Sequence, residues 1–131
     1  MATIFTKIVA GEIPSYKLAE SDDYYAFLDI RPLQKGHALV IPKRENDYVF
    51  DLEDAELTGL MIFAKRVARA MDKVMPCERI GVAIVGLEVP HTHIHLIPIN
   101  SVTDMDFTKP ITDMTKEEFE SIASKIAAEI K

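Results

Sequence analysis

Cysteine is almost absent from this chain, because Cys77 is the one cysteine among 131 residues. A single cysteine excludes an intrachain disulfide, so the fold must be stabilised by its hydrophobic core. The start of the sequence also lacks a basic segment followed by an apolar stretch and a cleavage site, and so gives no indication of a secretory signal. We therefore expect a cytoplasmic protein, in a compartment where thiols stay reduced.

A surplus of basic residues is missing too. The chain has 15 Lys and Arg against 21 Asp and Glu, a formal net charge of −6. Since nucleic-acid backbones are bound by clustered Lys and Arg, we expect no nucleic-acid partner. A single phosphate group can be bound by a few backbone N–H groups and imidazoles, so the charge does not exclude a small nucleotide. No apolar run approaches the ~20 residues that a membrane-spanning helix needs, and we expect no membrane partner.

Glycine is scarce and lacks the spacing of the common phosphate-binding loops. The five glycines form neither GxGxxG nor GxxxxGK[ST]. A nucleotide would therefore have to be bound in another way.

The remaining composition, with 48% hydrophobic and 27% charged residues, is that of a soluble globular protein. The length and the lack of repeats or linkers predict a single domain over residues 1–131. Apolar residues at helical spacing predict helices over residues 4–10, 51–75 and 115–131. Apolar runs bounded by turn residues predict five strands, over residues 15–20, 24–30, 37–42, 80–87 and 93–99. We expect an α+β fold with a five-stranded, mostly antiparallel sheet, a long central helix and a C-terminal helix.

Three of the four histidines stand at alternate positions in the stretch HTHIHLIP, residues 91–98. The fourth, His37, lies in KGHALVIPK. Because alternate residues of a strand share a face, His91, His93 and His95 are expected to line one side. At a rise of ~3.3 Å per residue, neighbouring imidazoles are attached ~6.6 Å apart and the outer pair ~13 Å apart.

Three interpretations of this row can be compared. A purely structural row would require three interior imidazoles to be desolvated without use, which is costly. A metal site is the main rival, although a straight strand cannot bring all three rings onto one ion. A His-x-His site would need a further ligand, such as His37 or Asp29.

Nucleophilic catalysis explains the spacing best. Neutral imidazole, with an unperturbed pKa of ~6.5, is available as a nucleophile near pH 7. Attack on phosphorus gives a covalent phospho-imidazole and divides one hard displacement into two easier ones. The flanking imidazoles can then donate hydrogen bonds to phosphoryl oxygens or a proton to the leaving group.

The sequence resembles the histidine-triad (HIT) family of nucleotide hydrolases and transferases, and in particular its bacterial phosphoramidase branch. HTHIHLIP matches the family's His-φ-His-φ-His-φ-φ signature, where φ is an apolar residue. Three further segments are similar to the opening segment, the ribose-contact strand and the third strand of the family: IFTKIVAGEIPS at 4–15, AFLDIRP at 26–32 and GHALVIPK at 36–43. The chain after Asn100 has no matching pattern.

The resemblance implies a role for each site residue. His93 would be the nucleophile that attacks the α-phosphorus of a nucleoside monophosphate derivative. His95 would contact the phosphate and leaving group, and His91 and His37 would orient and polarise the other rings. Asp29 would accept hydrogen bonds from both ribose hydroxyls. Backbone N–H groups near Glu88 would hold a phosphate. The apolar slot for the base would be formed by Phe5, Ile8, Phe27 and Ile30.

Two departures from the family pattern bear on the substrate and on metal binding. Leu87 stands where Gln is common, before Glu88, which favours phosphoramidates or adenylates over dinucleoside polyphosphates. Thr3 and Thr6 replace the zinc-binding cysteines of many bacterial members, so we expect no metal and no cofactor.

The predicted function is hydrolysis of purine nucleoside phosphoramidates or related derivatives, releasing AMP or GMP, by a homodimer. The alternatives are a dinucleoside polyphosphate hydrolase and a nucleotide-binding protein without turnover.

Overall fold

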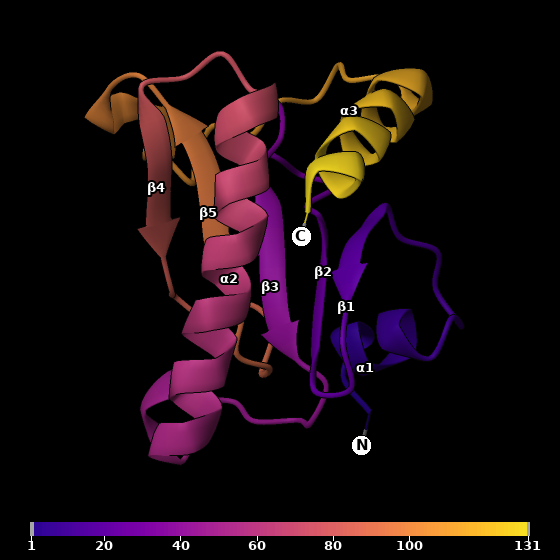
Figure 1. Ribbon diagram of the computed structural model, residues 1–131, viewed down its shortest axis with the longest axis vertical. Helices are drawn as coiled ribbons and strands as arrows, with labels where there is room; N and C mark the ends of the chain where they lie inside the picture. The colour runs from indigo at the N-terminus through magenta and orange to yellow at the C-terminus, as the bar shows by residue number, and fades with distance from the viewer. Residues whose placement is uncertain (1, 131) are drawn as a thin grey trace.

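A computed structural model describes residues 2–130. Within that range, five strands form one sheet of order β1-β2-β3-β5-β4, and every neighbouring pair is antiparallel (Figure 1). The expected α+β fold with a long central helix is confirmed. The strands are β1 (Lys17–Glu20), β2 (Tyr24–Leu28), β3 (Ala38–Pro42), β4 (Arg79–Ala83) and β5 (Ile94–Ile99). The helices are α1 (Ile4–Val9), α2 (Asp54–Val74) and α3 (Lys116–Glu129), with short 3₁₀ turns η1 (Val49–Asp51) and η2 (Val102–Met105).

The two faces of the sheet are covered by different helices. In β2, Ala26 and Leu28 belong to the larger core cluster with α2 and α3, whereas Phe27 packs with Phe5 and Ile8 of α1. This alternation is the period of two that an extended strand imposes on its side chains. It places α2 and α3 on one face and α1 on the other.

Local signals explain where the helices begin and end. Thr3 caps α1 by accepting from the Thr6 N–H, and Gly11, with φ of 82°, follows the last turn. The predicted capping box of α3 is present, since Thr115 and Glu118 bond to each other's backbone N–H groups. Among the described residues, no helix is long and apolar enough to traverse a bilayer.

Most predicted element ends lie within two residues of those in the structure, but the start of the long helix and the end of the fourth strand differ by more. The long helix begins at Asp54, because Val49–Asp51 form a 3₁₀ turn. The strand predicted over 80–87 ends at Ala83, and residues 84–90 form a loop in which Gly86 has φ of 74°.

The strand predicted over residues 93–99, with His91 in register before it, begins at Ile94. Its ladder with β3 starts at the Val40–Ile94 pair, because β3 ends at Pro42, which has no N–H to donate. His91 and His93 therefore precede the strand. The backbone here pairs with another segment, the Thr92 N–H donating to the Asn46 carbonyl at 2.6 Å.

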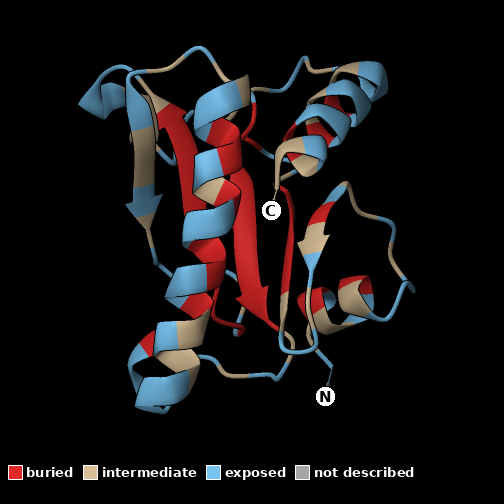
Figure 2. Cartoon of the chain, viewed as in Figure 1, coloured by how far each residue is buried: buried red, intermediate tan, exposed pale blue. Residues whose placement is uncertain are grey.

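Burial separates the central strands from the edge strand β4. Strands β2, β3 and β5 are mostly buried, whereas β4 is intermediate or exposed along its length (Figure 2). The β4 edge of the sheet is thus open to a further contact.

Candidate active site

A pocket of about 290 Å³ opens beside β5, next to the loop 84–90 and the segment after η2. The His95 side chain lies on the face of the sheet opposite to α2, because its neighbours Ile94 and Leu96 belong to the core beneath that helix. Residues that are far apart in the sequence line this pocket: Asp29, Arg31, Leu33, His37, Val85, Gly86, Leu87, Glu88, His93, His95, Phe107 and Pro110.

The hydrogen bond made by His93 determines which of its nitrogens can react. The His93 Nδ1–H donates to the carbonyl oxygen of His91 at 2.7 Å, because a carbonyl can only accept. A neutral ring that carries its proton on Nδ1 has a lone pair on Nε2. His93 thus brings to the pocket a nitrogen suited to nucleophilic attack.

His37 and His95 are joined by a bond of equally definite direction. The Leu33 N–H donates to His37 Nδ1 at 3.0 Å, so the proton of the neutral His37 ring is on Nε2. That Nε2–H donates to His95 Nδ1 at 2.9 Å. His95 therefore carries its own proton on Nε2, where it can be donated to a phosphoryl oxygen or a leaving group.

Burial keeps this pair neutral near pH 7. Desolvation, with a smaller contribution from neighbouring imidazoles, lowers the pKa of His37 to about 3 and that of His95 to about 4. The Asp29 carboxylate opposes this shift at His95. His95 is consequently a neutral hydrogen-bond donor.

Asp29 is fixed at the end of β2 by backbone and imidazole contacts. Its Oδ1 accepts from the Arg31 N–H at 2.8 Å, and its Oδ2 lies 3.6 Å from His37 Nε2. One ligand atom each from Asp29, His37 and His95 lie within 4.8 Å of one another, so this trio has a donor set for a metal ion. A metal would have to displace the proton shared by His37 and His95.

His91 lies outside the pocket and is fully buried. Its Nε2–H donates to the Pro42 carbonyl at 2.7 Å, and its Nδ1 lies 2.7 Å from the hydroxyl of Thr3. Thr3 in turn bonds to Thr6, and Thr6 donates to Glu45. From sequence, Thr3 and Thr6 were expected only to replace cysteines, and Glu45 gave no signal, because a contact between positions 6 and 45 leaves no local pattern.

The residues predicted to form the base slot lie in two environments. Phe5 and Ile8 of α1 are buried against Phe27 of the sheet. The Phe5 ring contacts the His93 ring edge-on, with 5.0 Å between their centroids. Ile30 is 69% exposed, and Glu88 is exposed at the pocket rim.

The pocket also has an apolar wall that sequence reasoning did not find. It is formed by Leu33, Val85, Phe107 and Pro110, and the Phe107 ring contacts His95 edge-on at 4.9 Å. Phe107 follows Asn100, in the part of the chain without a recognisable pattern, so only the fold brings it to the site.

Comparison with known proteins gives consistent matches. A family model described as "HIT domain" matches residues 10–102. Adenosine 5'-monophosphoramidase HNT1 of Saccharomyces cerevisiae is 48% identical over 99 residues, which cover 74% of this chain and 62% of the yeast protein, less than two thirds of its length. Adenosine 5'-monophosphoramidase hnt1 of Schizosaccharomyces pombe is 36% identical over 134 residues that cover both chains completely.

Among solved structures, a Hit-like protein from Bartonella henselae, described as involved in cell-cycle regulation, matches with a TM-score of 0.83 and 31% identity. The match covers 96% of this chain and 94% of the other.

Proposed function

The chain belongs to the HIT domain family, and on that premise we propose that it hydrolyses purine nucleoside phosphoramidates or related nucleoside monophosphate derivatives. The observation that carries the proposal is the pairing of two imidazoles with complementary hydrogen bonds in one pocket. The Nε2 of His93 has a lone pair and the Nε2 of His95 has a proton. The phosphoramidase names of the two yeast relatives agree with this substrate class.

The proposed reaction has two displacements at the α-phosphorus. His93 Nε2 attacks phosphorus and the phosphorus–nitrogen bond to the leaving amine breaks, while the amine takes up a proton from solvent and His95 Nε2–H donates a hydrogen bond to the reacting group. Water then attacks the nucleotidyl-histidine, and its proton returns to solvent. The nitrogen–phosphorus bond breaks, the nucleoside monophosphate is released, and His93 regains its lone pair.

The remaining site residues are proposed to hold the substrate. Asp29 accepts hydrogen bonds from the ribose hydroxyls, and backbone N–H groups near Glu88 hold a phosphoryl oxygen. Phe5, Ile8, Phe27 and Ile30 are proposed to form the slot for the purine base. A metal is not part of the proposed mechanism, so EDTA-treated, metal-free protein should keep full activity.

The proposal is tested by incubating the protein with adenosine 5'-phosphoramidate and measuring AMP release. Wild-type protein should release AMP, and His93→Ala should reduce the rate to the background. Mass spectrometry of acid-quenched protein should find an adenylyl group on His93. Equal rates for wild type and His93→Ala would refute the proposed enzymatic activity. AMP binding without turnover or adduct would identify a nucleotide-binding protein instead.

A dinucleoside polyphosphate hydrolase is the less favoured alternative, because Leu87 has no hydrogen-bond donor to offer a bridging phosphate oxygen. A higher kcat/KM for diadenosine polyphosphates than for the phosphoramidate would reverse that preference.

We also propose that residues 1–131 form a single domain that works as a homodimer in the cytoplasm. The homodimer is supported by the unpaired edge of β4 beside the exposed side chains of Met61, Ile62 and Val82. A cytoplasmic location is supported by the single cysteine.

Val82→Lys should convert the dimer to a monomer in light-scattering measurements. Val102→Lys, a matched change at an 89% exposed valine, should leave the dimer intact. A wild-type monomer would contradict the dimer proposal.

A further inference from the structure

We propose that Thr3, Thr6 and Glu45 are positioning residues for the nucleophile, which act through the ring and backbone of His91. The inference rests on the proposed function only where it concerns turnover. Thr3, Thr6 and Glu45 are absent from the pocket lining, so any effect on the reaction has to pass through another residue.

The His91 ring is fixed from both sides. Because the Pro42 carbonyl can only accept, the His91 proton lies on Nε2 in the bond of 2.7 Å. Burial lowers the pKa of His91, so the ring is neutral near pH 7 and its Nδ1 is an acceptor. The Thr3 hydroxyl, 2.7 Å away, is then the donor to Nδ1.

Glu45 determines the direction of the hydrogen bonds that connect it to His91. The Thr6 hydroxyl donates to Glu45 Oε1 at 2.7 Å, and the Thr3 N–H donates to the same oxygen at 3.1 Å. These bonds hold the pKa of Glu45 below its ordinary value, so the carboxylate remains an acceptor. Since the Thr6 hydroxyl proton is used at Glu45, Thr6 cannot donate it to Thr3. Thr3 Oγ1 lies 3.2 Å from Thr6 Oγ1 and 2.7 Å from His91 Nδ1, so the single hydroxyl proton of Thr3 is given to the closer acceptor, His91.

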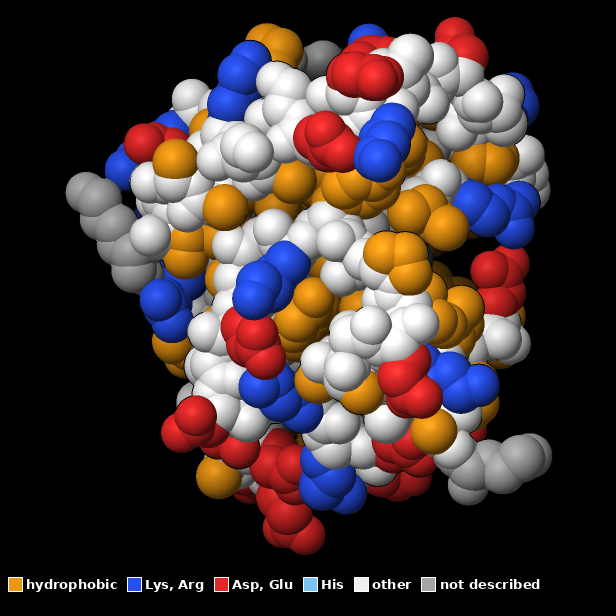
Figure 3. Space-filling view, turned by 90° about the vertical axis from the view of Figure 1, so that its right-hand side faces the viewer, with side chains coloured by type: hydrophobic (Ala, Val, Ile, Leu, Met, Phe, Trp, Pro, Cys, Tyr) orange, Lys and Arg blue, Asp and Glu red, His pale blue; other side chains and the backbone are white. Residues whose placement is uncertain are grey.

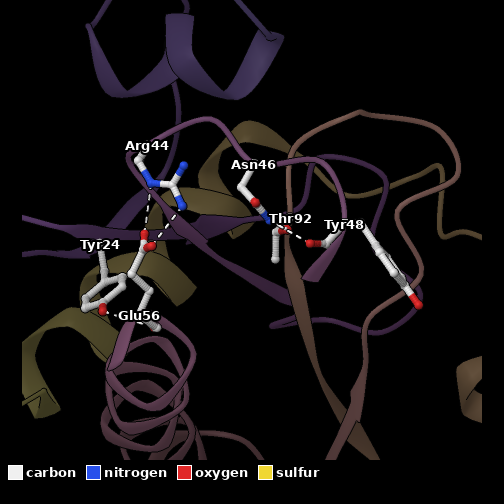
Figure 4. Close-up of polar contacts among 6 residues, drawn as sticks. All are labelled: Tyr24, Arg44, Asn46, Tyr48, Glu56 and Thr92. Atoms are coloured by element: carbon white, nitrogen blue, oxygen red, sulfur yellow. Dashed lines mark hydrogen bonds and ion pairs between the residues drawn. The ribbon is translucent and has the colours of Figure 1, made fainter. Parts of the chain in front are cut away.

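The backbone beside His91 is held by residues 43–48, which we call the clamp loop. Besides the Thr92 N–H bond to the Asn46 carbonyl, Asn46 Nδ2 donates to Thr92 Oγ1 at 3.0 Å and to the Tyr48 carbonyl at 2.7 Å (Figure 4). The same loop is attached to α2 by two bonds from the Arg44 guanidinium to Glu56, at 2.9 and 2.8 Å.

The consequence for His93 follows from its own hydrogen bond. His91 is held by its ring and Thr92 by its backbone, so the His91 carbonyl stays 2.7 Å from His93 Nδ1. If the His91 ring moves, that carbonyl moves with it and His93 loses the acceptor for its Nδ1 proton. The alternative His93 tautomer carries the proton on Nε2 and has no lone pair there for attack. Misplacement of this kind is expected to cost on the order of tenfold to a hundredfold in kcat.

The experiment compares full-length Thr3→Val, Thr3→Ser and Glu45→Ala with wild type, and Thr108→Val serves as a matched control. Thr108 also donates its hydroxyl to a carboxylate, that of Asp106 at 2.6 Å, away from His91. Two quantities are measured: the tautomer of His93, from the ¹⁵N chemical shifts of its ring, and kcat and KM for adenosine 5'-phosphoramidate.

Thr3→Val should shift His93 from the Nδ1–H form to a mixture and lower kcat with little change in KM. Thr3→Ser should restore both quantities, and Thr108→Val should change neither. Glu45→Ala should give a smaller change in the same direction. Because Glu45 is exposed, that variant should fold even if Thr3→Val does not.

An unchanged His93 tautomer in Thr3→Val and Glu45→Ala would overturn the inference, as would a loss of kcat that Thr3→Ser fails to restore. Failure of the proposed function is distinguishable, because wild type would then release no AMP. The tautomer comparison would still decide whether these residues position His93.

Discussion

At the scale of single residues, the properties of the site come from which hydrogen-bond partner each group is given. His93 and His95 are chemically identical imidazoles. A carbonyl at Nδ1 leaves Nε2 of His93 for the proposed role of nucleophile, and an imidazole donor at Nδ1 leaves His95 with an N–H to donate at Nε2. Asp29 is similar, because the Arg31 N–H fixes one carboxylate oxygen while the side chain still lines the pocket.

The proposed ribose contact of Asp29 predicts a selective loss of affinity. Asp29→Ala should weaken AMP binding by on the order of tenfold, since hydrogen bonds to a charged group contribute about 1.5–3 kcal/mol. Binding of 2',3'-dideoxy-AMP, which lacks both hydroxyls, should change little. Calorimetry with the two ligands measures both, and an equal loss for both would contradict the ribose contact.

At the scale of elements, the packing of α2 against β2 depends on one glycine in the helix interior. A Cβ added at Gly59 would overlap the phenol oxygen of Tyr24. That side chain has little freedom to move, because its hydroxyl donates to the Glu56 carbonyl at 3.2 Å and its ring packs on Phe63.

Gly59→Ala should therefore destabilise the protein, although glycine is normally worse than alanine in a helix by about 1 kcal/mol. Overpacking costs about 1–3 kcal/mol, so we expect a net loss of about 1 kcal/mol in the free energy of unfolding. Urea denaturation measures this change in the free energy of unfolding. The exposed neighbouring change Thr58→Ala should be neutral or stabilising, and Tyr24→Phe should partly rescue Gly59→Ala. A more stable Gly59→Ala variant would contradict the close approach.

At the scale of the whole molecule, burial of the histidines links the site to the free energy of unfolding. The surface carries mixed charge. All four histidines are buried, and burial lowers the pKa of His37, His91 and His95. Basic and acidic side chains are interspersed on the face shown in Figure 3. This face therefore has no broad basic patch of the kind that binds a nucleic-acid backbone.

The lowered pKa values predict a loss of stability in mild acid. Above pH ~6.5 His37, His91 and His95 are neutral in the folded and unfolded states alike. Below it, the unfolded chain binds protons that the folded protein does not, so the free energy of unfolding falls. This fall continues to about pH 4 for His95 and about pH 3 for His37.

Urea denaturation between pH ~7 and ~5 tests this dependence, above the range in which carboxylates titrate. A free energy of unfolding that stays constant over this interval would contradict the prediction.

Local sequence was sufficient for the elements and for the choice of the histidines as candidate reactive groups. Spacing and caps located three helices and five strands, with the largest errors at the start of α2 and the end of β4, because those ends depend on partners elsewhere. The row of histidines also indicated phosphorus chemistry, since few other roles account for three imidazoles in one interior segment.

Only the tertiary structure decided what each imidazole is able to do. In the fold, His91 lies outside the pocket, His37 is hydrogen-bonded to His95, and the Phe107 ring contacts the His95 ring. The fold also connects Thr3 and Glu45, 42 positions apart, around the ring of His91. The physical reason is that tautomer, pKa and orientation depend on the partners that surround a ring, and these partners come from segments that are distant in the sequence.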